Sequence, residues 1–233
     1  MRQIFLDTET TGFSPENGDR IIEIGAVEMV KRRLTQHNYH QYINPEREIP
    51  EDAIRVHGIT DERVKDEPKF AQIGDAFMNY VKGAELIIHN APFDVGFINH
   101  ELSLLPNNPW GKIEDHCVIT DSLKMAQKEY PGQRNTLDAL CRRLFIDNTK
   151  RTFHGALLDS ELLAEVYLGM TGGQTGLDLE VQLSESNEFN TASLTSKRQE
   201  RAFKVISASA EEENLHQKKL TEMNKKSGLN LGW

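Results

Sequence analysis

Apolar and polar positions in the first 170 residues recur with two different periods. Continuous or alternating apolar runs bounded by turn residues predict β-strands at 2–8, 21–31, 39–43, 85–89 and 116–120. Apolar positions three and four apart predict helices at 70–82, 92–105, 121–129, 135–146 and 155–170. Three leading strands followed by strands that alternate with helices indicate an α/β domain, with a mixed five-stranded sheet flanked by helices.

Two of the predicted helices begin with residues suited to capping. Asn90 precedes the helix over 92–105, whose first turn holds Pro92, and Asn135 starts the helix over 135–146. An asparagine side chain can accept a hydrogen bond from a free amide of the first turn, and proline has no amide that needs one. We therefore expect both asparagines to be N-caps.

The composition changes near residue 171. Thr171-Gly172-Gly173 opens a stretch rich in Ser, Asn, Thr and Glu that runs to about residue 200, as in a flexible linker. We therefore expect a folded domain over 1–173, a flexible linker over 174–200 and a short partner-binding segment over 201–233.

The last segment carries structural signals of its own. Residues 203–207 predict a short strand, and Ser209-Ala210-Glu211-Glu212 forms a capping box before a charged helix that should end near Gly228. The chain then ends in Leu229-Asn230-Leu231-Gly232-Trp233. A terminal aromatic residue of this kind is suited to anchoring in a partner.

Charge narrows the range of functions. The 233 residues carry a formal net charge of −9, and −8 of it falls on the first 173. Electrostatic affinity for nucleic acid comes from Lys and Arg, so this balance argues against a generic polyanion binder. A function on nucleic acid would have to bring in positive charge, and bound metal ions would supply it.

Simpler features argue against other classes. With 38% apolar and 27% charged residues, the composition suits a soluble globular protein. No stretch approaches the ~18–20 apolar residues needed to cross a bilayer. The N-terminus meets charge at Asp7, unlike a secretory signal. Cys117 and Cys141 lie in apolar contexts without metal-type spacing, so we expect buried thiols in a reducing compartment.

Two carboxylates lie at the end of the first predicted strand. Because side chains alternate along a strand, Asp7 and Glu9 share a face with Phe5. Neighbouring carboxylates at the end of a buried strand repel each other and are costly to desolvate. Taken alone, this pair is better explained as a solvated strand end before a turn.

Two predicted helices also place a carboxylate among apolar residues. Asp94 shares a helix face with Phe97 and Ile98, and Asp159 lies on the apolar stripe of its helix with Leu163. Each could be a first-turn acid favoured by the helix dipole. An ionised group on a core stripe usually has a partner, however, and no Arg or Lys lies within a turn of Asp159.

Four inward-facing acids from three separated elements share one explanation, a site for hard divalent cations. Mg²⁺ and Mn²⁺ prefer carboxylate oxygens and water, and two such ions ~3.5–4 Å apart can assist hydrolysis of a phosphodiester. His154 stands just before the helix of Asp159, and histidine is suited to taking a proton from an attacking water. A solvent-exposed histidine at a helix start is the alternative.

Three motifs, in this order, resemble those of the DEDDh family of 3′→5′ exonucleases, which have a ribonuclease-H-like fold. They are Phe5-Leu6-Asp7-Thr8-Glu9-Thr10-Thr11-Gly12, His89-Asn90-Ala91-Pro92-Phe93-Asp94, and His154 followed five residues later by Asp159. The resemblance covers roughly residues 2–173. The segments 21–34, 56–62 and 171–175 further resemble the members that proofread for bacterial replicative DNA polymerases.

The resemblance implies roles for individual residues. Two Mg²⁺ or Mn²⁺ ions would be held by four acids, with the first as the bridge: Asp7, Glu9, Asp94 and Asp159. His154 would be the general base. The substrate would also contact Asp7, Glu9 and Asp159, together with His57, which matches a family position near the terminal nucleotide. Asp52 stands where the family pattern has glutamate, and it would line the same site.

The resemblance also implies an activity and partners. The activity is hydrolysis of the 3′-terminal phosphodiester of single-stranded or frayed DNA, releasing nucleoside 5′-monophosphates in the cytoplasmic, nucleoid-associated replisome. Residues 174–179 are similar to peptides that dock into the bacterial sliding clamp, with Gln174, Leu177 and Leu179 as anchors, although a plain linker is equally compatible. The C-terminal segment would bind the catalytic (alpha) subunit of the polymerase, and a small third core subunit is a further partner to test.

Two other interpretations stay open from the sequence. An RNA 3′-end-trimming exoribonuclease of the same family would share the motifs, but such enzymes are usually compact and do not need sixty residues of linker and tail. A non-catalytic adaptor between clamp and polymerase would not need four acids together with His154.

Overall fold

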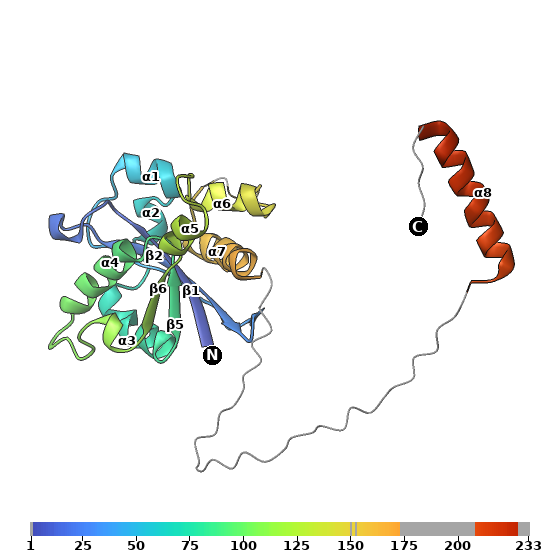
Figure 1. Ribbon diagram of the computed structural model, residues 1–233. Helices are drawn as coiled ribbons and strands as arrows, with labels where there is room; N and C mark the ends of the chain where they lie inside the picture. Colours follow the sequence, from blue (N-terminus) through green and yellow to red (C-terminus); the bar gives the residue numbers. More distant parts are fainter. Residues whose placement is uncertain (1, 150, 152, 173–207, 228–233) are drawn as a thin grey trace, which may run out of the picture. The chain divides into compact units, whose positions relative to one another are not determined.

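The computed structural model describes residues 2–149, 151, 153–172 and 208–227. The chain divides into two units, Met1–Leu179 and Glu180–Trp233. In the described part of the chain, the first unit holds every strand and every helix except α8 (Ala210–Ser227) (Figure 1).

The sheet of the first unit is mixed. Its strands are β1 (Arg2–Thr10), β2 (Ile21–Val30), β3 (Arg33–Leu34), β4 (Tyr39–Tyr42), β5 (Glu85–Ile88) and β6 (Val118–Asp121). Their order is β3-β2-β1-β5-β6, and β4 also pairs with β2. β1 is antiparallel to β2 and parallel to β5, which is parallel to β6. The predicted mixed sheet is confirmed, with β3 as a sixth strand too short to show a period.

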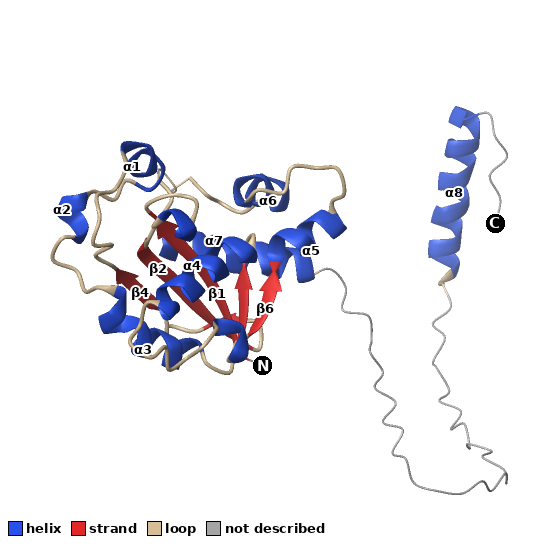
Figure 2. Cartoon of the chain, turned by 90° about the vertical axis from the view of Figure 1, so that its left-hand side faces the viewer, coloured by secondary structure: helices blue, strands red, loops and turns tan. Residues whose placement is uncertain are grey.

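Helices cover both faces of this sheet (Figures 1 and 2). On one face α3 (Phe70–Val81) and α4 (Ala91–Ser103) pack over Ile4 and Leu6. On the other, α6 (Leu137–Leu144) and α7 (Ala156–Thr171) pack over Phe5. Because side chains alternate along β1, its residues pack into two cores, one on each face of the sheet. Each fully buried Leu, Ile or Phe contributes about 1.5–3 kcal/mol to the stability of the fold. Because both faces are covered, β2 is buried at nine of its ten positions.

The predicted elements of this unit all exist, and each observed end lies within two residues of the predicted one, including α5 (Ser122–Glu129). The pattern did not predict α1 (Glu51–His57), α2 (Asp61–Val64) or the 3₁₀ turns η1 (Pro15–Asn17) and η2 (Ile113–Asp115). Segments of three to seven residues make too few turns to show helical periodicity.

The two predicted caps differ from expectation. Asn90 does hold the N-cap position of α4, but it adopts a left-handed φ of 71° and makes no capping bond. The prediction for Asn135 was wrong, because Thr136 caps α6 by accepting from the amide of Ala139 at 3.4 Å. The side chain of Asn135 bonds instead to the Tyr130 carbonyl and to Arg143.

The second unit contributes α8 alone to the described residues. The predicted capping box is confirmed, since Ser209 Oγ accepts from the Glu212 amide at 3.3 Å and the Glu212 carboxylate accepts from the Ser209 amide at 2.8 Å. Leu215 is 62% exposed on this helix. The strand predicted at 203–207, the clamp-like peptide 174–179 and the chain end 229–233 lie outside the described residues.

The described helices include none with the length and apolar content to cross a bilayer. Cys117 and Cys141 are both buried and unpaired, as predicted.

One close contact fixes α7 against the sheet. A Cβ at Gly25 of β2 would lie 2.2 Å from the backbone of Ala156, so any larger residue would push the start of α7 away. Ser160 Oγ donates to the Gly25 carbonyl at 2.9 Å. This contact sets the first turns of α7, which carry Asp159, beside the carboxyl end of β1. Parallel strands commonly place ligand sites at that end.

Candidate active site

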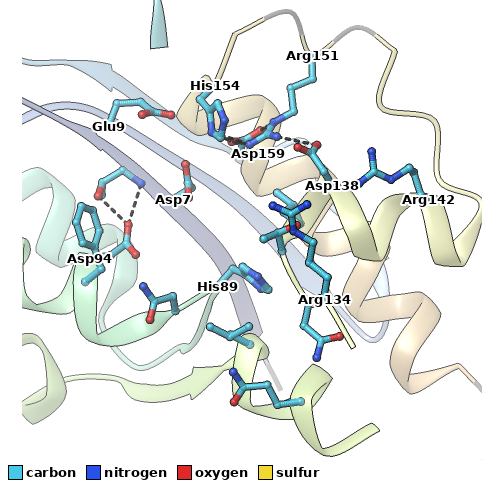
Figure 3. A pocket seen from close by; sticks show the side chains of 18 of the residues that line it. Asp7, Glu9, His89, Asp94, Arg134, Asp138, Arg142, Arg151, His154 and Asp159 are labelled. Carbon is cyan, nitrogen blue, oxygen red and sulfur yellow. Dashed lines mark hydrogen bonds and ion pairs between the residues drawn. The ribbon is translucent and has the colours of Figure 1, made fainter. Parts of the chain in front are cut away.

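The acids predicted from the sequence line one cavity of about 650 Å³ (Figure 3). β1 contributes Asp7 and Glu9, α4 contributes Asp94, and α7 contributes Asp159, with His154 just before it. Four acids and a histidine from three separate parts of the chain therefore meet at one place.

Asp94 is held by uncharged donors. Its Oδ1 accepts from the Thr8 amide at 3.1 Å and from Thr8 Oγ1 at 2.7 Å, and the residue is 3% exposed. Burial raises the pKa of Asp94 to about 7, despite these hydrogen bonds. Thr8 thus links the end of β1 to the start of α4.

The two acids of β1 also favour protonation. Burial raises the pKa of Asp7 well above its ordinary value, and repulsion from Asp94 and Glu9 adds to the effect. Burial raises the pKa of Glu9 to about 8, with Asp159 and Glu23 as the next causes. A bound cation would relieve this repulsion.

Asp159 differs from the other three acids because its partner is a cation. Arg151 donates from Nε to Oδ1 and from Nη2 to Oδ2, both at 2.6 Å, and its Nη1 lies 2.8 Å from Asp138 Oδ1. Burial would raise the pKa of Asp159, but hydrogen bonds from His154 and Arg151 hold it below its usual value. Figure 3 shows Arg151 between the two aspartates.

This pair adds a residue that the sequence analysis missed. No Arg or Lys lies within one helical turn of Asp159, but Arg151, eight residues earlier in the chain, donates hydrogen bonds to its carboxylate. An arginine close to His154 was the only signal available.

His154 is half exposed and has two neighbours at Nδ1. Arg151 Nη2 lies at 2.7 Å and Asp159 Oδ2 at 3.4 Å. A guanidinium can only donate, so with Arg151 bound to Nδ1 the proton of a neutral ring sits on Nε2. If Nδ1–H faces Asp159 instead, Nε2 has a free lone pair. His154 can accept a proton at Nε2 only after Arg151 has left Nδ1.

A divalent cation fits this site. Glu9, His154 and Asp159 offer ligand atoms that all lie within 4.8 Å of one another. Carboxylate oxygens and imidazole nitrogens are ordinary ligands of divalent metals. Asp7 and Asp94 lie outside that tight group but line the same cavity. The donor chemistry and the crowding of acids therefore both suit metal binding.

A second cavity, of about 580 Å³, adjoins Glu9. It is lined by the chain after Glu9 and by residues of α1, including Asp52, Val56 and His57. His57 Nδ1 accepts from the Ile59 amide at 3.0 Å, so the ring proton is on Nε2. Burial lowers the pKa of His57, which favours the neutral ring.

The Nε2 atom of His57 is buried and finds no hydrogen-bond partner within the described residues. Leaving a buried donor unpaired costs about 1–3 kcal/mol, so a ligand with an acceptor group would stabilise this site.

Glu23 is a further residue that the sequence analysis missed. It lies across from Glu9 in the β1–β2 pair, accepts from the Ala156 amide at 3.1 Å and lies 2.6 Å from His40 Nε2. Gly155, the N-cap of α7, has no side chain to cap the helix, so Glu23 does so from the sheet. His40, to which the sequence analysis gave no role, holds Glu23 in place.

Comparisons with known proteins agree with this geometry. The family model RNase_T, described as exonuclease, matches residues 4–167. The chain is 49% identical over 243 residues to DNA polymerase III subunit epsilon of Haemophilus influenzae, covering 100% of this chain and 94% of that one. It is 49% identical over 232 residues to the protein of the same name from Escherichia coli K12, covering 97% and 95%.

A solved structure gives the same fold. Exonuclease X in complex with 5′-overhanging duplex DNA superimposes with a TM-score of 0.55 at 24% identity, covering 73% of this chain and 91% of that one. The predicted ribonuclease-H-like architecture is thereby confirmed.

Proposed function

The chain belongs to the exonuclease family and, within it, to the DNA polymerase III epsilon subunits, and from this membership we propose that it proofreads for a bacterial replicase. The reaction is hydrolysis of the 3′-terminal phosphodiester of DNA. The observation that carries the proposal is that Asp7, Glu9, Asp94 and Asp159 line one cavity with His154.

The four acids would hold two divalent cations, Mg²⁺ or Mn²⁺. When bound, such ions activate the attacking water and stabilise the leaving oxygen of the phosphodiester. The raised pKa values of Glu9 and Asp94 support this role, because buried acids that repel one another gain most from a cation.

His154 would act as the general base. With Nδ1–H donating to Asp159, its Nε2 accepts a proton from the attacking water. The new bond forms at the last phosphorus, and the bond between that phosphorus and the upstream O3′ breaks. The products are a nucleoside 5′-monophosphate and a strand that ends in a free 3′-hydroxyl.

The second cavity would take the terminal nucleoside. His57 Nε2–H offers a donor to it, Asp52 lines the rim, and the chain after Glu9 lies against it. A mispaired end frays more readily than a paired one, so fewer base pairs must open before the 3′ end reaches this cavity. Selectivity for mismatches therefore requires no reading of base sequence.

Degradation of a 3′-mismatched DNA primer and of a short RNA, each with and without chelator, tests the proposal. We expect chelator-sensitive loss of the mismatched primer and much slower loss of the RNA. Equal loss of both would favour an RNA-trimming enzyme, and no loss of either would favour a non-catalytic adaptor.

The remaining residues would serve partners in the cytoplasmic replisome. We propose that the tail over 201–233 binds the catalytic (alpha) subunit and that residues 174–179 dock on the sliding clamp through Gln174, Leu177 and Leu179. A small third core subunit would bind the exonuclease domain over 1–173. The exposed Leu215 of α8 supports a partner for the tail, since an apolar side chain gains by leaving water.

Deleting residues 200–233 tests the tail. The truncated protein should keep its activity on free oligonucleotides and lose co-purification with the alpha subunit. If it still co-purifies, the anchor lies elsewhere.

A further inference from the structure

The catalytic cavity extends beyond the acids toward α5 and α6. Its lining also includes Gln127, Gln133, Arg134 and Arg142. Figure 3 shows Arg134 and Arg142 across the cavity from Asp94, on the side of Asp138. The cavity thus has an acidic end and an end with two cations.

These two arginines are available for a ligand. Both are exposed, and in the described part of the chain neither forms an ion pair, whereas Arg151 on the same cavity is engaged by Asp138 and Asp159. The domain has a net charge of −8, so two neighbouring arginines without an ion pair make this wall more positive than the domain as a whole.

The loop that carries Arg134 is fixed by its own hydrogen bonds. Arg143 donates to the Arg134 carbonyl at 3.0 Å and to Asn135 Oδ1 at 3.1 Å, and its guanidinium lies 4.5 Å from the Tyr130 ring centroid. Asn135 is 7% exposed and donates to the Tyr130 carbonyl at 3.2 Å. The backbone of Arg134 is therefore held at the cavity wall, which lowers the entropy cost of using its side chain in binding.

We propose that Arg134 and Arg142 bind phosphates of the nucleotides upstream of the scissile bond. The strand then enters along this wall, its last phosphodiester lies at the acids, and its terminal nucleoside occupies the second cavity beside Glu9. This inference rests on the proposed exonuclease function. It gives the acidic domain a defined place where a polyanion is attracted without metal.

The test compares two substrates of the full-length chain. One is a single-stranded oligodeoxythymidylate, and the other is the p-nitrophenyl ester of thymidine 5′-monophosphate, which has no upstream phosphate. The Arg134→Gln/Arg142→Gln double variant should raise KM for the oligonucleotide about tenfold at low salt and leave KM for the ester unchanged. The slope of log affinity against log salt should fall by about 1.4, the value for two phosphate contacts to a single strand.

Arg33→Gln is the matched control, because Arg33 is an exposed arginine in β3 that does not line the cavity. An unchanged oligonucleotide KM and salt slope in the double variant would overturn the inference. An equal rise in KM for the ester would do so as well, because the arginines would then contact the terminal nucleotide.

A binding measurement separates this inference from the proposed function. Fluorescence anisotropy with an oligodeoxythymidylate that carries a phosphorothioate at its 3′-terminal linkage reports affinity independently of turnover. If the wild type hydrolysed neither substrate, the proposed function would fail. A loss of affinity in the double variant, but not in Arg33→Gln, would still support the phosphate contacts.

Discussion

The two sides of the active-site cavity carry the same chemical group with pKa values shifted in opposite directions. Asp94 on α4 and Asp159 on α7 are both 3% exposed. Burial raises the pKa of Asp94 to about 7, whereas Arg151 and His154 hold the pKa of Asp159 below its ordinary value. Depth in the protein therefore does not decide the direction of these pKa shifts; the neighbouring His154 and Arg151 do.

This difference suggests how the site responds to a cation. In the described part of the chain no ion pair neutralises Asp94, Asp7 or Glu9, and Arg151 is the weakest of the influences on the pKa of Asp7 and of Glu9, so a metal ion relieves repulsion there. Asp159 already has a positive partner, which competes with a metal ion for its carboxylate oxygens. The α4 side should therefore gain more free energy from metal binding than the α7 side.

Removing an acid from the α4 side should have the largest effect. In Asp94→Asn the amide oxygen can still accept from Thr8, so the fold should persist while a proposed metal ligand loses its charge. We expect kcat on a single-stranded oligonucleotide to fall by about 10⁴-fold. Glu16→Gln, at an acid outside both cavities, is the control. Activity near that of the wild type would show that Asp94 is structural.

His154→Ala should come next, with turnover reduced by about 10²–10⁴-fold. The variant also tests whether His154 is a base or a ligand, because it lies in the tight group with Glu9 and Asp159. A base predicts that Mn²⁺ affinity, measured by calorimetric titration, is largely kept. An unchanged rate would remove His154 from the mechanism, and a large loss of Mn²⁺ affinity would make it a ligand.

Arg151→Gln should reduce the difference in pKa between Asp94 and Asp159. Asp159 would then be a buried acid without a cation, and the metal-free protein should lose about 3 kcal/mol of unfolding free energy. Mn²⁺ should bind about fivefold to tenfold more tightly, because no guanidinium competes for Asp159. Urea unfolding in chelator and calorimetric titration measure the two effects, with Arg55→Gln as an exposed control. Weaker Mn²⁺ binding would mean that Arg151 positions the site instead of competing for it.

The same comparison shows which part of the site could be read from the sequence. Asp7, Glu9, Asp94 and Asp159 interrupt apolar patterns on their own strand or helix, so each is an anomaly over a few residues. Their partners interrupt nothing. Glu23 reaches Ala156 across 133 positions, and an arginine before a helix is ordinary. Local patterns therefore found the acids, and only the folded chain reveals what sets their charge.

The same distinction separates the elements of the fold that could be predicted from the sequence from those that could not. Strands and helices with several turns could be predicted because each repeats its pattern several times. α1 was missed although it forms a wall of the second cavity, because its seven residues show no clear period. Its place depends on long-range contacts such as the bond from the His154 amide to the Val56 carbonyl at 3.1 Å.

The smallest expected effect is on stability against pH, and it tests the raised pKa values directly. Glu9 and Asp94 have ordinary pKa values of 4.5 and 3.8, against about 8 and about 7 in the folded, metal-free protein. Between these limits the folded state binds more protons than the unfolded state, so the unfolding free energy should fall as pH rises from about 5 to 8. The stabilisation from Asp159, whose pKa is lowered, is complete above its unfolded value of 3.8 and stays constant over this range.

We expect a loss of about 1–3 kcal/mol of unfolding free energy between pH 5 and 8, measured by urea unfolding with chelator. Glu9→Gln and added Mn²⁺ should each reduce this loss. The lowered pKa of His57 acts in the opposite direction over this range, so the comparison with Glu9→Gln and Asp94→Asn decides. An equal pH dependence in the wild type and both variants would show that these acids are already ionised at pH 5, and the contrast between Asp94 and Asp159 would disappear.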